Sequence, residues 1–110
     1  MATIRGRRLL LTGDIEPPAQ SAVAADLRAA PIDVIKVPHH GSRFQSPLLP
    51  VWAPAPIALI SVGEGNDYGH PAAETLAAWS RAGAMLARTD LLGDVAVVDS
   101  AGRLGIVPRR

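Results

Sequence analysis

The sequence predicts an α/β fold, because short apolar stretches alternate with segments that carry helix signals. The predicted strands of this series are residues 8–12, 32–37, 57–61 and 85–88. The predicted helices between them are residues 19–30, 47–53 and 71–81. This alternation is typical of βαβ units around a parallel layer. Two more strands, residues 94–98 and 103–107, flank the turn Ala101-Gly102 and predict a C-terminal β-hairpin.

The first half of the series is bounded by glycine and proline. The strand 8–12 ends at Gly13-Asp14, and Pro17-Pro18 separates it from the helix, in which Val23 and Leu27 stand at helical spacing. The strand 32–37 is too apolar to face solvent on either side, and Pro38 ends its pairing. We expect the amino group of Lys36, inside this strand, to reach solvent along its aliphatic stem.

The second half follows the same logic. Pro54 and Pro56 end the short helix 47–53, and the strand 57–61 is a near-continuous apolar run. Pro71 is predicted at the first helical position of 71–81, and Gly83 is predicted to stop that helix.

Composition limits the protein to one domain, residues 1–110, with 48% hydrophobic residues to build its core. The net charge is +1 and the basic residues are scattered, so composition does not indicate electrostatic nucleic-acid binding. Aromatic residues make up 4%, so a stacking platform for single strands is not expected within this segment alone. No run approaches the roughly 18–20 apolar residues of a membrane helix, and we expect a soluble segment.

The absence of cysteine excludes disulfides and thiolate metal sites. Imidazole and carboxylate remain as the strong ligands, which suit Zn, Mn or Fe. A nucleophile elbow, a phosphate-binding P-loop and a dinucleotide fingerprint are all missing, and Gly63-Glu64-Gly65 lacks the third glycine. The sequence therefore predicts no small-molecule organic cofactor.

Residues able to bind metal or move a proton follow three predicted strands. Asp14 follows the first, His39 and His40 follow the second, and His70 follows the third. Because the carboxyl ends of parallel strands meet at one edge of a sheet, we expect Asp14, His40 and His70 to converge there.

Asp14 and the two adjacent histidines each allow alternatives. Asp14 is either a turn former or helix N-cap, or a carboxylate that bridges two metal ions about 3.5–4 Å apart. In an extended backbone the rings of His39 and His40 point to opposite sides, so only one is expected to bind metal directly. The other orients it, contacts a substrate phosphate, or lies in a surface loop.

The remaining candidates surround these groups. His70 is either an exposed loop histidine or an imidazole that serves the leaving oxygen or binds metal. Tyr68 is a hydrogen-bond donor or acid near it, whereas Asn66 and Asp67 suit a turn. Gly41 permits a sharp turn, and Ser42 either donates a hydrogen bond to a phosphate or caps the next segment of the chain.

Five motifs in order along residues 8–98 resemble the C-terminal metallo-β-lactamase-fold domain of ComEC-type competence proteins. They are Leu-Leu-Leu-Thr-Gly-Asp-Ile-Glu (9–16), Asp-Val-Ile-Lys-Val-Pro-His-His-Gly-Ser (33–42), Ile-Ser-Val-Gly (60–63), Asn-Asp-Tyr-Gly-His-Pro (66–71) and Arg-Thr-Asp (88–90). The resemblance implies half of an αββα sandwich, with a mixed sheet, βαβ units and a C-terminal β-hairpin. In that family a membrane channel takes up DNA, and the soluble domain is thought to be a metal-dependent nuclease.

The resemblance also implies roles for single residues. Asp14 matches the late acidic motif that bridges two metals, and the His-His-Gly-Ser histidine that binds the second metal is assigned to His40. His39 and His70 are expected to serve catalysis near the substrate, and Ser42 and Tyr68 to bind it. The early His-x-His-x-Asp-His motif, which supplies most ligands, has no counterpart here. The chain thus corresponds to the second half of a domain about twice as long, as a fragment, a truncated reading frame or a piece of a larger protein.

The leading expectation is therefore part of a metal-dependent hydrolase, a phosphodiesterase or nuclease with two Zn or Mn ions and DNA as its substrate. Its partners would be the missing N-terminal half-domain or the parent channel in the inner membrane, with this domain on the extracytoplasmic side. The isolated chain is expected to be inactive. The alternatives are another metallo-β-lactamase-fold hydrolase, for a different phosphodiester, an ester or a lactam, and a non-catalytic remnant or interaction module.

Overall fold

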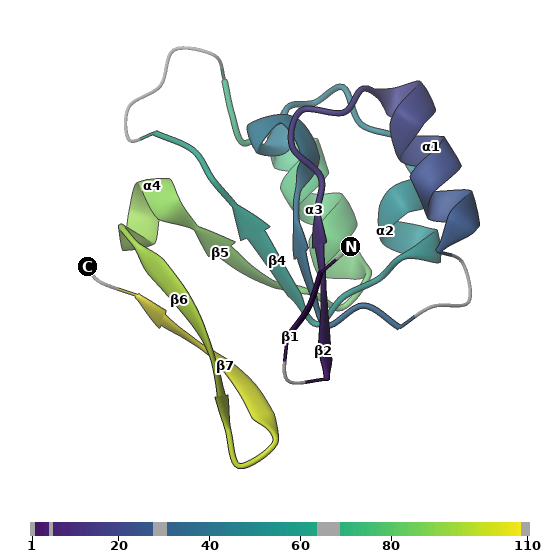
Figure 1. Ribbon diagram of the computed structural model, residues 1–110. Coiled ribbons are helices and arrows are strands. Elements are labelled where there is room, and N and C mark those ends of the chain that lie inside the picture. The colour runs from purple at the N-terminus through teal and green to yellow at the C-terminus, as the bar shows by residue number, and fades with distance from the viewer. Residues whose placement is uncertain (1, 5, 28–30, 64–68, 109–110) are drawn as a thin grey trace.

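The computed structural model describes residues 2–4, 6–27, 31–63 and 69–108, which form a five-stranded sheet and a separate hairpin (Figure 1). The sheet contains, in spatial order, β1 (Ala2–Ile4), β2 (Arg7–Leu11), β3 (Val34–Lys36), β4 (Ile57–Ile60) and β5 (Met85–Arg88). β1 runs antiparallel to β2, and the other neighbours are parallel. The hairpin is β6 (Val95–Ser100) with β7 (Arg103–Pro108). The predicted α/β class, the mixed sheet and the C-terminal hairpin are confirmed.

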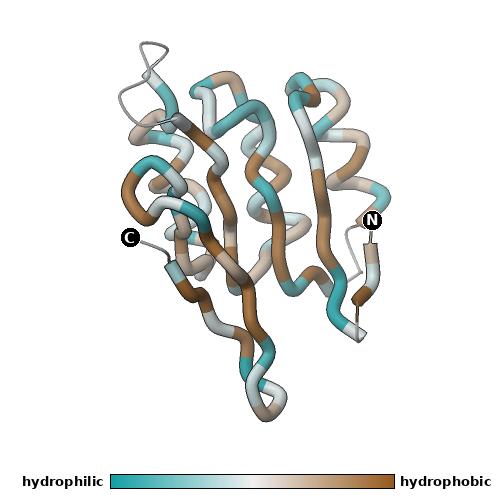
Figure 2. The backbone as a smooth tube through the Cα atoms, turned by 60° about the vertical axis from the view of Figure 1, so that its left-hand side comes forward, coloured by the Kyte–Doolittle hydropathy of each residue, from teal (hydrophilic) through white to brown (hydrophobic). Residues whose placement is uncertain are grey.

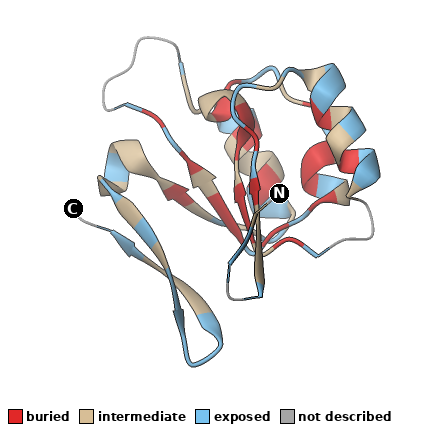
Figure 3. Ribbon diagram, in the orientation of Figure 1, coloured by how far each residue is buried: buried red, intermediate tan, exposed pale blue. Residues whose placement is uncertain are grey.

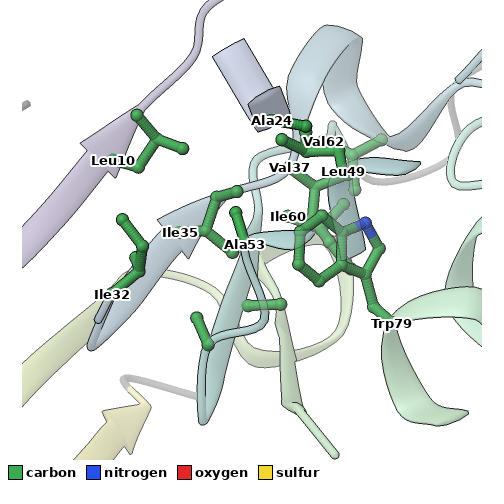
Figure 4. Packing of buried hydrophobic residues seen from close by; sticks show 12 residues of the cluster. Leu10, Ala24, Ile32, Ile35, Val37, Leu49, Ala53, Ile60, Val62 and Trp79 are labelled. Carbon is green, nitrogen blue, oxygen red and sulfur yellow. The ribbon is translucent and has the colours of Figure 1, made fainter. Parts of the chain in front are cut away.

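Three helices pack on one face of the sheet. They are α1 (Pro17–Asp26), α2 (Leu48–Trp52) and α3 (Ala73–Arg81), and the single turn α4 (Thr89–Leu92) follows β5. Figure 4 shows Ala24 of α1, Leu49 of α2 and Trp79 of α3 gathered above the strands. In the described part of the chain, no helix combines the length and the apolar character needed to cross a membrane.

Several boundaries differ from the sequence prediction. α1 begins at Pro17 rather than after Pro18. The first backbone N–H groups of a helix have no partner within the helix, so proline, which lacks an N–H, fits there without losing a helical hydrogen bond. Conversely, α3 begins at Ala73, and Pro71 stays outside it. β1 and α4 were not predicted: both are very short, and β1 exists through its pairing with β2.

The pairing register separates two faces of the sheet. Leu10, Ile35, Ala58 and Leu86 are register partners and form the row that faces the helices. Figure 3 shows that buried residues concentrate in the central strands and on the inner sides of the helices, whereas the hairpin is half-buried or exposed. Apolar segments run along the strands and polar ones gather at the turns (Figure 2). The hydrophobic core therefore lies between the sheet and the helix layer.

The opposite face is only partly covered. Near the carboxyl ends of the strands, the row of register partners on this face is Leu11, Lys36, Leu59 and Ala87. Leu11 is 65% exposed. Lys36 is half-buried on this face, which explains how a lysine fits inside an apolar strand. The hairpin reaches the lower part of this face, where Arg7 of β2 pairs with Asp99 of β6 at 3.0 Å.

Candidate metal centre

The carboxyl ends of β2, β3 and β4 bring the candidate residues together. The backbone N–H of His39 donates to the carbonyl of Gly13 at 2.9 Å, which joins the β2 and β3 loops. His40 Nε2 then lies 3.5 Å from Asp14 Oδ1. The rings of His39 and His70 meet edge to face, with centroids 5.8 Å apart. The predicted convergence of Asp14, His40 and His70 is confirmed, whereas their metal and substrate roles stay predictions.

The two histidines occupy a left-handed turn, not an extended strand. They lie in the 3₁₀ turn η1 (Pro38–Gly41), with φ angles of 49° at His39, 54° at His40 and 77° at Gly41. Left-handed backbone costs a residue other than glycine roughly 1–2 kcal/mol. This turn sends the His40 ring toward Asp14 and the His39 ring toward His70.

Gly41 fixes the loop of His70 against this turn. A Cβ at position 41 would lie 2.8 Å from Cβ of Pro71, so only glycine fits there. The carbonyl of Gly41 accepts a hydrogen bond of 2.8 Å from the backbone N–H of Ala72. The sequence predicted the sharp turn at Gly41, and the structure adds this close approach of a second loop.

A backbone carbonyl selects the tautomer of His40. Nδ1 of His40 lies 2.6 Å from the carbonyl oxygen of Ser61, which can only accept. The proton therefore sits on Nδ1, and in the neutral ring the lone pair belongs to Nε2, which lies 3.5 Å from Asp14 Oδ1. Metal-binding histidines characteristically donate their second N–H to a carbonyl or carboxylate in this way.

Asp14 does not cap the following helix. The N-cap position of α1 is Glu16, and no side chain makes a cap hydrogen bond there. The Asp14 and His40 side chains are 65% and 45% exposed, so both are open to solvent. Typical Zn–N and Zn–O distances are about 2.0–2.2 Å, and atoms 3.5 Å apart can bind one ion. Among the described residues, no group of three or more His, Asp or Glu side chains could hold a metal ion.

The surroundings of His70 lower the proton affinity of its imidazole. Partial burial lowers the pKa of its imidazole below 6.5, and the neighbouring His39 and His40 lower the pKa further. The ring is therefore neutral at pH 7 and ready to accept a proton or a metal ion. A role as general acid requires it first to take up a proton.

Two predicted substrate residues have different outcomes. Ser42 is 2% exposed, and its hydroxyl has no hydrogen-bond partner among the described residues. Its carbonyl accepts hydrogen bonds from Thr75 Oγ1 at 2.8 Å and Gln45 Nε2 at 3.0 Å. Its predicted substrate contact stays a prediction. Tyr68 lies outside the described residues, as do Asn66 and Asp67.

Ser42 borders a surface pocket of about 290 Å³ beside His70. The pocket is lined by Ser42, Arg43, Phe44, Gly69, His70 and Ala72. It joins the loop after η1 to the loop before α3, and sequence reasoning did not identify it. Arg43 and Phe44 are exposed at its rim, and no sequence pattern singled them out.

Sequence reasoning gave no role to the Arg-Thr-Asp motif at the end of β5. Thr89 Oγ1 accepts a hydrogen bond of 2.8 Å from the N–H of Val62 and donates one of 2.9 Å to its carbonyl. Val62 follows Ser61, whose carbonyl holds His40. The motif therefore fixes the segment after β4 that selects the His40 tautomer. The sequence signal for this role is the run of hydrogen-bonding residues Arg88, Thr89 and Asp90 at the end of an apolar strand.

Arg88 and Asp90 flank this threonine as a pair. Arg88 Nε and Nη2 donate to the two carboxylate oxygens of Asp90 at 3.1 and 2.8 Å. The hydrogen bond from Arg88 holds the pKa of the Asp90 carboxyl below its usual value. The pair closes the turn that carries Thr89.

Comparison with known proteins finds a similarity to a ComE operon protein. The chain is 33% identical over 96 residues to the ComE operon protein 3 of Bacillus subtilis (strain 168). The aligned region covers 82% of this chain and 12% of that protein, so the chain spans a small part of its relative. No protein-family model matches the chain. No solved structure matches it either.

Proposed function

We propose that this chain is the C-terminal half of a metallo-β-lactamase-fold nuclease domain of the ComEC type, in which Asp14 and His40 bind a divalent metal ion. The observation that carries the proposal is the fixed tautomer of His40, whose Nε2 carries the lone pair of the neutral ring and lies 3.5 Å from Asp14 Oδ1. The similarity to a ComE operon protein supports a role in DNA uptake during competence.

The arrangement favours a cation between the two side chains. A lone pair and a carboxylate oxygen repel each other unless a proton or a metal ion lies between them. Both groups are open to solvent, so a metal ion can reach them without displacing the core. A proton on Nε2 gives only an exposed ion pair, which contributes about 0–1 kcal/mol.

When bound, divalent ions such as Zn or Mn, two in the complete domain, would neutralise charge on a phosphodiester and lower the pKa of a bound water. Asp14 and His40 would hold them. His70, on the far side of His39, would first take up a proton on its neutral imidazole and would then donate that proton to the leaving oxygen. Ser42 and Tyr68 would contact the substrate.

Two ligands do not complete a catalytic site, which commonly has three protein ligands per ion. We propose that an N-terminal half-domain, with its own His-x-His-x-Asp-His motif, supplies the others and covers the open face of the sheet. Its apolar surface there includes Leu11 and Met85, 65% and 49% exposed. The ligand count also favours a second candidate, a non-catalytic remnant of such a domain.

Zinc titration of the ¹⁵N-labelled chain tests the metal site by imidazole NMR. We expect Zn²⁺ to shift Nε2 of His40 while Nδ1 keeps its proton, and Asp14→Asn to weaken this response at least about 10-fold. Asp26→Asn, which removes the same charge from an exposed position in α1, is the matched control. An unchanged response in Asp14→Asn would show that Asp14 is not a ligand.

A nuclease assay tests the rest of the proposal. The purified chain is expected not to cleave DNA with Zn²⁺ or Mn²⁺. A protein that also carries the early motif is expected to cleave DNA and to lose activity in Asp14→Asn. Metal-dependent cleavage by the isolated chain would contradict the half-domain assignment, and no cleavage by the longer protein would favour the remnant.

A further inference from the structure

We propose that Phe44 and Arg43 form a nucleotide subsite beside His70, where one base of a single-stranded nucleic acid stacks on Phe44 and the adjoining phosphate contacts Arg43. This inference rests on the proposed function, because it names the substrate class of the same site. It begins with the exposure of Phe44, which is 62%. Among the described aromatic residues, Trp79 is buried and Trp52 half-buried, so Phe44 is the ring presented to solvent.

Arg43 places its own cationic guanidinium over this ring. Its guanidinium carbon lies 5.1 Å from the Phe44 ring centroid, within the range of a cation–π contact. Arg43 is exposed, and no carboxylate pairs with it among the described residues. A planar guanidinium with free donors is well suited to a phosphate, which it can bind through two hydrogen bonds.

The pocket places this pair next to the candidate chemistry. Phe44 and Arg43 line one side of the 290 Å³ pocket, and His70 lines it too. The His70 ring also contacts His39 of η1. A strand seated on Phe44 would therefore continue past His70 toward Asp14 and His40. Ser42 also lines the pocket, and its buried hydroxyl lacks a hydrogen-bond partner among the described residues.

These features together favour a nucleic acid over the other substrates of this fold. Stacking of a base on an aromatic ring typically contributes about 5- to 150-fold in affinity and tolerates every base. The phosphate beside the base accepts hydrogen bonds from the Arg43 guanidinium. A small ester or lactam does not combine an aromatic base with an adjoining phosphate. The scarcity of aromatic residues predicts no extended platform, so one base per site is the expected capacity.

The test compares two fluorescent oligomers of equal length and charge, an oligothymidine and an abasic strand, by anisotropy in EDTA. The chain is expected to bind oligothymidine at least about 5-fold more tightly. Phe44→Leu should reduce this preference to below 2-fold, and Phe44→Tyr should retain it. Val51→Ala, which alters another exposed apolar side chain, should leave it unchanged.

Arg43→Gln should weaken both oligomers and lower the slope of log affinity against log salt by about 0.7, the value for one phosphate contact on a single strand. Arg103→Gln removes the same charge at the far hairpin and should leave the slope unchanged. Equal affinity for the two oligomers, or a preference that survives in folded Phe44→Leu, would overturn the subsite. Because no metal is present, this outcome is independent of the zinc titration: an unchanged zinc response in Asp14→Asn would refute the metal centre and leave the subsite standing.

Discussion

Two acid–base pairs lie at the carboxyl edge of the sheet, and they differ in nearly every physical respect. Arg88 and Asp90 share two hydrogen bonds, with side chains 28% and 11% exposed. Asp14 and His40 share a single contact of 3.5 Å, with side chains 65% and 45% exposed. A shielded bidentate pair stabilises the fold, whereas an open pair at long distance contributes little to it. The comparison therefore assigns Arg88–Asp90 to the stability of the fold and leaves Asp14–His40 as the pair whose atoms are accessible to an ion.

The backbone shows the same contrast. The residues after β3 adopt left-handed conformations at His39 and His40, whereas Arg88, at the end of β5, has an ordinary φ of −104°. Strained backbone persists where surrounding contacts hold it, and it commonly occurs at functional sites. At the β3 end, the holding contacts are Gly13 with His39 and Gly41 with Ala72.

The largest expected effect comes from breaking the structural pair. Asp90→Asn should lower the free energy of unfolding by about 1.5–3 kcal/mol, because it leaves the Arg88 charge without its partner. The lowered pKa of Asp90 means that its contribution is complete above the unfolded value of 3.8 and is lost as pH falls through the folded value. Urea denaturation at neutral and acid pH should show the difference between wild type and variant shrink in acid. A difference that persists unchanged in strong acid would contradict this origin.

Relief of the strained turn should have a smaller effect of the opposite sign. His39→Gly is expected to raise the free energy of unfolding by about 0.5–1 kcal/mol, since glycine adopts φ of 49° without strain but loses more chain entropy. Ala101→Gly, at φ of 53° in the hairpin turn, is the control for a left-handed residue away from the site. If Ala101→Gly raises the free energy of unfolding and His39→Gly does not, the turn at His39 is not strained.

The smallest effect is expected at the open pair. Asp14→Asn should change the free energy of unfolding by less than about 0.5 kcal/mol in the absence of metal, because both side chains are exposed. Thermal or urea denaturation in EDTA measures it. A loss above about 1 kcal/mol would place Asp14–His40 with the structural pairs and weaken its assignment as a ligand pair.

The sheet could be predicted because its strands are short apolar runs bounded by glycine and proline, as at Gly13 and Pro38. The hairpin was visible for the same reason. The start of α1 was misjudged because proline both breaks helices and begins them, and the sequence does not say which. β1 was missed because three residues have no periodicity and depend on a neighbouring strand.

The location of the candidate site followed from topology, but its internal geometry did not. The left-handed turn depends on the approach of Gly41 to Pro71, two residues 30 positions apart. The His40 tautomer depends on the carbonyl of Ser61, a backbone atom in another loop. The role of Thr89 depends on Val62, 27 positions away. Contacts between distant segments leave no pattern in the local sequence.

The left-handed histidines also bear on how variants of this chain would be ranked. A screen that scores single substitutions by cellular abundance rewards stability, and it would favour glycine over histidine at position 39. Under the proposed function, a screen for DNA cleavage by a protein that also carries the early motif would rank the same two residues in the reverse order. Redesign for expression alone would therefore replace His39 with glycine. Positions that the two screens rank differently would identify the residues of the site, even if its ligand is unknown.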